Sequence, residues 1–216
     1  MPKRWHIQPH DQSVVMGIER SAGVSPIVAR LLAARGLTDA TAVRSFLAGT
    51  MSDLRDPDLL PGVADAADRI LAAAKAGRRI VIYGDYDADG MSATAIMAGC
   101  LEALDANAGW YVPDRLEEGY GLNGDALRSL AEKGTNLVVT VDCGIASVAE
   151  ARVAKDLGLE LIVTDHHSFA DTLPEADVLV HPRLPGRTIP SANSAVRAWP
   201  SSSSGRSRPA PRARSR

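Results

Sequence analysis

The stretch IVIYGDYDADGMSAT, residues 80–94, joins an apolar run to a cluster of acidic residues. The run IVIY has the apolar, β-branched composition of a fully buried strand. Three carboxylates follow at alternate positions, Asp85, Asp87 and Asp89, and the small residues from Met91 onward predict a helix. Like charges this close repel one another, so the cluster is costly unless a cation lies among them. The stretch therefore predicts a metal site at the end of a buried strand.

Strand and helix patterns alternate along the rest of the chain. Short apolar runs predict strands, and amphipathic runs predict helices. The expected strands are residues 80–83, 109–112, 137–141, 160–164 and 177–180, and the expected helices are 63–76, 91–104, 124–133 and 146–157. This alternation is typical of an α/β fold with a parallel sheet and helices on both faces. Right-handed crossovers then bring the carboxyl ends of the strands to one edge.

The composition divides the chain into three segments. Residues 1–62 contain two short predicted helices within 25–48 and a turn-rich linker, and residues 63–190 contain the alternating pattern. Residues 191–216 are rich in Ser, Arg and Pro and lack acidic residues and apolar periodicity, so we expect them to be disordered. Such a tail could bind nucleic acid, or it could be foreign to the fold, as from a shifted reading frame. The end of the regular pattern directly after a strand favours the second interpretation.

The overall composition is that of a soluble globular protein, with 45% hydrophobic and 23% charged residues among 216. The two cysteines, Cys100 and Cys143, provide no disulfide framework. The amino terminus lacks the apolar stretch of a signal peptide, and no apolar run is long enough to span a membrane. We therefore expect a cytoplasmic protein.

The formal net charge of −2 conceals an asymmetry. The last acidic residue is Asp177, and eight arginines follow it. Residues 1–177 therefore hold sixteen basic residues against 26 acidic ones, a net charge of −10. A segment with this negative charge does not bind a polyanion by charge alone. Binding or hydrolysis of nucleic acid would need metal cations or local basic pockets.

Two further strand ends carry residue types that bind metals. Asp142 follows the run LVVTV, and Asp165, His166 and His167 follow LELIVT. Imidazole is a frequent ligand of transition metals and carboxylates prefer harder cations, so the mixed set suits manganese, with magnesium as the second option. Two alternatives need no metal: Asp142 could cap the next helix, and the histidines could be a pair at a helix start.

The acidic triplet also has two explanations other than a catalytic metal site. The pattern D-x-D-x-D-G matches the first half of an EF-hand loop, which requires Glu at the twelfth position. Counted from Asp85 that position is Ile96, and the triplet follows a strand rather than a helix, which excludes an EF-hand. The other alternative is a solvated acidic loop. Three acids at one strand end, followed by Gly90, favour the metal site, because a glycine lets the backbone approach a ligand closely.

The segment VPDRLEEGYGLN, residues 112–123, follows another predicted strand. Arg115 in this segment offers a planar, bidentate donor that can hold a phosphate group. It could equally pair with Glu117 or Glu118 in an ordinary surface ion pair. The residues by themselves leave both roles open.

Together these motifs resemble the DHH phosphoesterase superfamily and, within it, the RecJ family of single-stranded-DNA-specific 5′→3′ exonucleases. YGDYDADG (83–90), VDCG (141–144) and TDHH (164–167) are similar to the first three family motifs, in the family's order. The amino-terminal ARLLAARGLTDATAVRSFL, the linker DPDLLPGVADAADRI and the segment PDRLEEGYGLN are similar to RecJ proteins as well. The resemblance covers roughly residues 20–193, and three motifs in order are a stronger signal than any single one.

The resemblance implies a metal-binding role for each carboxylate. Asp87 and Asp89 match metal ligands of the family, and Asp142 matches a carboxylate that bridges two metal ions. His166 matches a ligand of the second ion. Asp85 is the RecJ-type addition to the first motif, and we expect it to bind metal too.

The resemblance also implies residues that contact the substrate. His167 matches a neighbour of the ligands that contacts the phosphate or supports the metal site. Arg115 falls in the region expected to hold the 5′ end, and Gly90 lies where the backbone would approach the substrate. Other branches of the superfamily carry a histidine at the position of Tyr83.

The reaction implied is two-metal phosphodiester hydrolysis, with Mn²⁺ or Mg²⁺, on single-stranded DNA with a 5′ end, in DNA repair and recombination. In the family a fourth motif supplies another metal-binding Asp downstream, whereas no Asp follows Asp177 here. We therefore expect a truncated chain with a frameshifted tail, which keeps the fold of the first domain but has impaired activity.

Two other functions remain as alternatives. The first is a DHH phosphodiesterase that acts on short oligonucleotides or cyclic dinucleotides, against which the Arg115 segment and the amino-terminal helices argue. The second is a non-catalytic module that binds nucleic acid or a partner protein.

Overall fold

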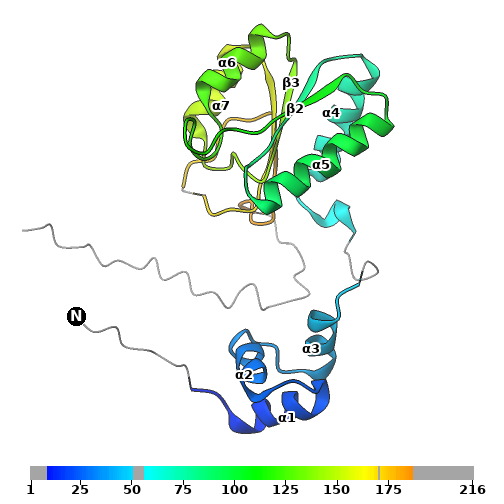
Figure 1. Cartoon of the computed structure of the whole chain (residues 1–216), viewed down its shortest axis with the longest axis vertical. Coiled ribbons are helices and arrows are strands. Elements are labelled where there is room, and N and C mark those ends of the chain that lie inside the picture. Colours follow the sequence, from blue (N-terminus) through cyan, green and yellow to red (C-terminus); the bar gives the residue numbers. More distant parts are fainter. Residues whose placement is uncertain (1–8, 51–55, 170, 187–216) are drawn as a thin grey trace, which may run out of the picture. The chain divides into compact units, whose positions relative to one another are not determined.

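A computed structural model describes residues 9–50, 56–169 and 171–186 of the chain (Figure 1). Internal contacts divide the chain into two compact units, and the second of these spans Arg55–Pro190. The predicted domain boundaries at residues 62 and 190 stay predictions. The disordered and foreign tail predicted at 191–216 lies outside the described residues.

The described part of the first unit is a cluster of three helices: α1 Gln12–Ala22, α2 Pro26–Ala34 and α3 Ala40–Leu47. They enclose a small apolar core of Val15, Ile18, Ala29, Leu32, Leu37 and Val43. The two helices expected within residues 25–48 are confirmed. Helix α1 has no counterpart in the prediction, although Asp11 caps its start and Gly23 ends it in a left-handed conformation, as helix boundary signals do.

The second unit contains a five-stranded sheet in which all strands are parallel. The strands are β1 Ile80–Tyr83, β2 Ala108–Tyr111, β3 Leu137–Val141, β4 Glu160–Thr164 and β5 Val178–Val180. Their order in the sheet is β2-β1-β3-β4-β5. The expected α/β class is confirmed, and each predicted strand lies within one residue of its observed bounds.

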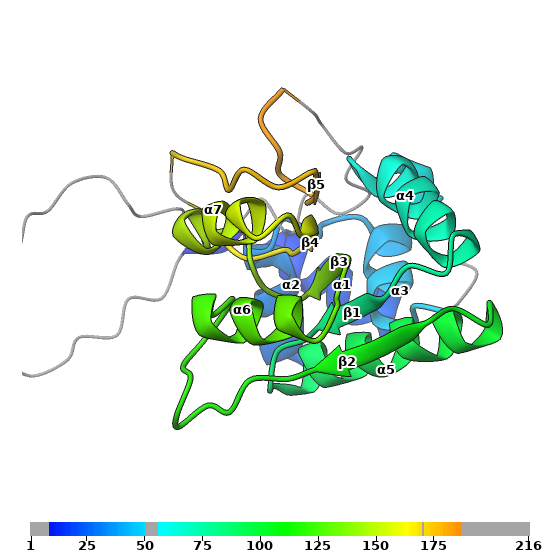
Figure 2. The same ribbon diagram turned by 90° about the horizontal axis from the view of Figure 1, so that it is seen from above.

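Helices cover both faces of this sheet (Figures 1 and 2). Helices α4 Val63–Lys75 and α5 Ala88–Ala103 pack on one face, and α6 Gly124–Glu132 and α7 Val148–Asp156 pack on the other. A short 3₁₀ helix, η2 Pro57–Leu59, precedes α4. Because helices cover each face of the sheet, the central strands β1 and β3 are buried at every position rather than at alternate ones. No helix in the described ranges is both long enough and apolar enough to cross a bilayer.

Two helices begin at residues other than those predicted. Helix α5 starts at Ala88, three residues before the predicted start, because the Asp87 carboxylate caps it and accepts a hydrogen bond from the Gly90 N–H at 2.9 Å. Asp89 therefore lies in the first turn of a helix and not in a loop. Helix α7 starts two residues later than predicted, at Val148.

The strand order reverses between β1 and β3. The chain leaves β1 through α5 toward β2 on one side, and α6 then carries it to β3 on the other side. At such a switch point the loops diverge and leave a crevice at the carboxyl ends of the strands. Tyr83 pairs level with Thr140, and Val141 pairs level with Thr164. The residues that follow β1, β3 and β4 therefore emerge together at one edge.

The turn before α4 packs directly on the edge strand β5. Gly62 has φ +85°, and a Cβ built on it would lie 2.1 Å from the Leu179 carbonyl oxygen. That oxygen belongs to the backbone and cannot move aside without disturbing the sheet. Only glycine fits this position.

Replacing Gly62 by alanine should destabilise the fold by about 3 kcal/mol or more, since steric overlap adds to the penalty of a left-handed alanine. Gly77→Ala is the matched control, because Gly77 also has a positive φ of 65° but no described atom lies within 4 Å of a Cβ there. The free energy of unfolding of that control should fall by only about 1 kcal/mol. Urea unfolding followed by circular dichroism measures both, and equal losses would contradict the packing described for Gly62.

Candidate metal centre

Two groups of side chains at the carboxyl edge have ligand atoms close enough to surround a metal ion. Asp85, Asp87 and Asp142 form the first group, and Asp142, His166 and His167 form the second. Within each group the ligand atoms all lie within 4.8 Å of one another. Asp142 belongs to both groups, so a single carboxylate can serve two ions.

Asp142 has a strained backbone and a partly unpaired carboxylate. Its φ of +65° is left-handed, which costs a non-glycine residue about 1–2 kcal/mol. The Oδ1 atom lies 2.8 Å from Nε2 of His166, whereas the buried Oδ2 has no hydrogen-bond partner in the described part of the chain. A buried carboxylate oxygen without a donor is unfavourable, and a bound cation would satisfy it. The donor set and this orphaned oxygen fit a divalent metal.

The pKa values of Asp142 and Asp87 are shifted in opposite directions. Burial raises the pKa of Asp142, while His166 opposes the rise and the nearby Asp87 carboxylate adds to it. The backbone N–H of Gly90 lowers the pKa of Asp87. A cation between these carboxylates would favour the ionised form of each.

The loop after β1 holds Asp85 in place through tight packing. Asp85 is 2% exposed, and its Oδ1 accepts a hydrogen bond from the Tyr86 N–H at 2.8 Å. A Cβ on Gly90 would lie 2.6 Å from the Cβ and carbonyl oxygen of Asp85. The structure thus gives Gly90 a packing and capping role, and its predicted contact with the substrate stays a prediction.

Asp89 belongs to neither group of ligand atoms. It is exposed and lines a cavity of about 410 Å³ together with Asp142 and His166. Its side chain therefore borders the candidate metal centre from the first turn of α5. Its predicted role as a metal ligand stays a prediction.

Asp165 organises the turn that carries the two histidines. Its Oδ1 accepts hydrogen bonds from the N–H groups of His166 (2.6 Å) and His167 (2.9 Å) and from Nδ1 of His167 (2.7 Å). Its Oδ2 accepts from the Ile145 N–H at 2.9 Å. Burial opposes ionisation of Asp165, but these hydrogen bonds outweigh it and lower its pKa. Because an ionised carboxylate only accepts, Nδ1 of His167 carries the proton.

The sequence pattern predicts ligands in the Asp-His-His triplet but assigns no site role to Asp165. Its position at a strand end, directly before two candidate ligands, is the signal that could have identified it. Tyr120, 54% exposed, was missed as well. Its hydroxyl lies 3.2 Å from Nδ1 of His167, which links the 112–123 segment to the histidines.

Arg115 approaches this site through aromatic contacts. Its guanidinium carbon lies 5.1 Å from the centroid of the Tyr86 ring, a cation–π contact. The Tyr86 ring in turn meets Tyr120 edge to face at 6.4 Å. The acidic neighbour Glu118 is engaged elsewhere, since it accepts hydrogen bonds from the Tyr111 hydroxyl and the Asp114 N–H.

Tyr83 is a core residue and not part of the metal centre. It is fully buried, and its hydroxyl donates to the Gly121 carbonyl at 3.3 Å. Burial raises its pKa, so the phenol stays protonated. At this position the chain thus carries a neutral side chain under the 112–123 segment.

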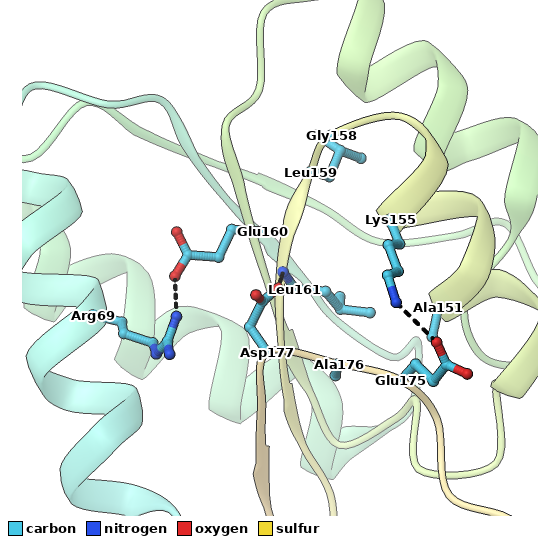
Figure 3. Close-up of a pocket in the computed structure, with 10 residues that line it drawn as sticks. All are labelled: Arg69, Ala151, Lys155, Gly158, Leu159, Glu160, Leu161, Glu175, Ala176 and Asp177. Atoms are coloured by element: carbon cyan, nitrogen blue, oxygen red, sulfur yellow. Dashed lines mark hydrogen bonds and ion pairs between the residues drawn. The ribbon is translucent and has the colours of Figure 1, made fainter.

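The opposite edge of the sheet contains a separate cavity of about 700 Å³ (Figure 3). Arg69 and Glu160 face each other there at 3.1 Å, and Lys155 pairs with Glu175 at 3.1 Å. These charges already neutralise one another, so this cavity lacks the unsatisfied groups that mark the carboxyl edge.

Comparison with known families identifies the class of protein. The model of the DHH family, N-terminal domain, matches residues 79–202, which is more than half of the chain. The chain therefore belongs to the DHH family. The resemblance predicted from the three motifs is confirmed.

Within that family the chain is similar to proteins named single-stranded-DNA-specific exonuclease RecJ. It is 46% identical to the Bacillus subtilis protein over 187 residues, which cover 87% of this chain and 24% of that protein. It is 37% identical to the Escherichia coli protein over 175 residues, which cover 81% of this chain and 30% of that protein. The chain thus spans about a quarter to a third of the length of these relatives.

Two solved structures share the fold. One is exonuclease RecJ bound to manganese, with a TM-score of 0.57 and 41% identity over 64% of this chain and 36% of that one. The other is RecJ from Thermus thermophilus in complex with Mn²⁺, with a TM-score of 0.58 and 31% identity over 87% of this chain and 26% of that one.

Asp142→Asn should leave the metal-free protein as stable as the wild type, or more so, at pH 7. A raised folded-state pKa means that the ionised carboxylate weakens the fold above that pKa, and asparagine removes the charge. With Mn²⁺ at about a hundredfold above its dissociation constant, the wild type should gain about 2.7 kcal/mol, and the variant should gain much less. Thermal unfolding in EDTA and in Mn²⁺ measures both effects.

The control for this variant is Asp125→Asn. Asp125 is an exposed residue of α6 whose side chain pairs only with Arg128 among the described residues. It should respond to Mn²⁺ as the wild type does. An Asp142→Asn protein that is stabilised by Mn²⁺ to the same extent would contradict the shared role of Asp142.

Proposed function

We propose that the chain carries the metal-binding domain of a RecJ-type exonuclease, which hydrolyses single-stranded DNA from the 5′ end with two Mn²⁺ or Mg²⁺ ions. The observation that carries this proposal is the double use of Asp142, whose carboxylate belongs to two groups of ligand atoms and has one oxygen with no hydrogen-bond partner among the described residues. The names of the relatives, and the manganese in a related structure, agree with it.

Asp85, Asp87 and Asp142 would hold one ion, and Asp142 with His166 would hold the other. The exposed Asp89 would complete the set from the first turn of α5. When bound, such ions lower the pKa of a water and neutralise the phosphate and the leaving oxygen. They would also offset the repulsion among the carboxylates that the fold places together.

The remaining site residues would handle the substrate. Arg115, held over the Tyr86 ring, would bind a phosphate near the 5′ end, because its guanidinium offers several donors in one plane. His167, oriented by Asp165, would contact the scissile phosphate. Gly90 would let the protein backbone approach the DNA closely. The exposed ring of Tyr120 offers a stacking surface for a base.

We propose the same division of the chain as the sequence predicts: a helical lead-in over residues 1–62, the DHH domain over 63–190 and a basic tail over 191–216. The match to the family model reaches residue 202 and so passes the predicted end of the domain. The chain has no Asp after Asp177 to supply a fourth-motif ligand, so we expect impaired turnover from these 216 residues by themselves. A cytoplasmic location fits this function.

The proposed activity predicts slow, Mn²⁺-dependent release of mononucleotides from 5′-phosphorylated single-stranded DNA and none from a blunt duplex. The assay uses the 216-residue chain in excess over DNA, so that a low rate is still detected. Asp142→Asn should abolish the product, because it removes the carboxylate that both ions share, and Asp125→Asn should not.

Other outcomes would favour the alternatives. Cleavage of dinucleotides or cyclic dinucleotides in preference to longer strands would indicate a phosphodiesterase of short substrates. Binding of DNA with the same background cleavage by wild type and Asp142→Asn would indicate a non-catalytic module. Family-level turnover would contradict the expected impairment, while leaving the nuclease assignment intact.

A further inference from the structure

The segment that follows β5 reaches back to the turn that carries the candidate metal ligands. His181, directly after β5, is fully buried, and its Nε2 lies 2.9 Å from the carbonyl oxygen of His167. Its Nδ1 accepts a hydrogen bond from the Arg183 N–H at 3.0 Å. Neither contact involves a group assigned to the proposed reaction.

These two contacts fix the protonation of the His181 ring. A carbonyl oxygen can only accept and a backbone N–H can only donate, so Nε2 carries the proton and Nδ1 is unprotonated. The Phe169 ring packs edge to face against the imidazole, with centroids 4.9 Å apart. His181 is therefore a neutral, buried residue that has one donor and one acceptor, and both are used.

Arg183 makes the second contact with the same turn. Its Nη2 donates to the carbonyl oxygen of His166 at 2.8 Å. The carbonyls of both histidines are therefore held by side chains from one three-residue segment. The Asp165 N–H also donates to the Val180 carbonyl at 3.1 Å, which continues the pairing of β4 with β5 into the turn.

The other side of the turn is held from the loop after β3. There Asp165 accepts the Ile145 N–H through Oδ2, as described above. The turn is thus fixed from β3 on one side and from the segment after β5 on the other. With its backbone held in this way, the His166 ring lies 2.8 Å from Asp142, at the second group of ligand atoms.

We propose that His181 and Arg183 are positioning residues for the second ion site, because they fix the backbone carbonyls of His166 and His167 and so hold the His166 ring against Asp142. This inference rests on the proposed function, which supplies the metal. It assigns a role to two residues that the motifs leave out, and the loss of a residue that orients a metal ligand typically costs about 10–100-fold in metal affinity.

Two substitutions of His181 separate its two hydrogen bonds. His181→Gln keeps a donor at the position of Nε2, within reach of the His167 carbonyl, and gives up the acceptor at Nδ1. His181→Asn keeps an acceptor at the position of Nδ1, within reach of the Arg183 N–H, and gives up the donor. Both variants bury a polar amide of similar size in the same place, so they control for each other.

The measurement is Mn²⁺ titration followed by electron paramagnetic resonance, which counts free ions. Wild type should bind two ions. His181→Asn should lower the affinity for the second ion about 10–100-fold and leave the affinity for the first within about twofold of the wild type. His181→Gln should keep both affinities within about threefold. Thermal unfolding in EDTA, run in parallel, identifies any general loss of structure.

A second variant tests the inference without touching the buried ring. Arg183→Met removes the exposed guanidinium but keeps the backbone N–H that donates to His181. It should lower the affinity for the second ion about tenfold. Arg128→Met, which removes an exposed arginine of an ion pair on α6, is the control and should leave the affinity for both ions unchanged.

The outcomes distinguish this inference from the proposed function. A wild type that binds no Mn²⁺ would overturn the proposed function itself. A wild type that binds two ions, with His181→Asn and His181→Gln equal in their effect or both without effect, would overturn the positioning role alone. Selective loss of the second ion in His181→Asn and Arg183→Met would support it.

Discussion

The level alignment of three parallel strands determines where every candidate ligand lies. Tyr83 pairs beside Thr140, and Val141 pairs beside Thr164, so β1, β3 and β4 end at the same edge. The strand order reverses between β1 and β3, and open parallel sheets place their ligand-binding crevice at such a switch point. A slip of one strand by a single residue would turn its side chains to the other face of the sheet and separate the ligand groups.

The same edge accumulates features that weaken a fold when no ligand is present. Asp142 has a left-handed backbone, a buried carboxylate with a raised pKa and one oxygen that no residue in the described ranges hydrogen-bonds. Such features persist where the surrounding structure holds them and function requires them. The core that holds them is apolar on both faces of the sheet, with Val81 on one side and Ile80 on the other. The free energy that the apolar core contributes to folding therefore offsets the cost of the strained residue at the edge of the sheet.

The sequence predicts the parts of this structure that depend on local pattern. Strand positions follow from continuous apolar runs, and the shared edge follows from the parallel topology that helix–strand alternation implies. The start of α5 was predicted three residues late because Asp87 serves both as a candidate ligand and as a helix cap, and the pattern of carboxylates suggested a loop. Helix α1 is not predicted, because most of its short apolar face lies outside the resemblance to known motifs.

Long-range hydrogen bonds account for what the sequence did not reveal at the site. Asp165 bonds the Ile145 N–H twenty residues away, and His181 bonds the carbonyl of His167. Backbone groups carry no residue identity, so no motif indicates which side chain will reach them. The composition of the candidate site was therefore predictable from strand ends, whereas the residues that hold it in position required the fold.

The most direct test of a metal centre built around one shared carboxylate is diffraction from crystals grown with Mn²⁺, with data collected at the manganese absorption edge. We expect two anomalous peaks about 3.5–4 Å apart, the separation of the ions in two-metal phosphatase and nuclease sites, with Asp142 contacting both. One peak should be bordered by Asp85 and Asp87, and the other by His166. A single peak, or two peaks of which only one contacts Asp142, would contradict this expectation.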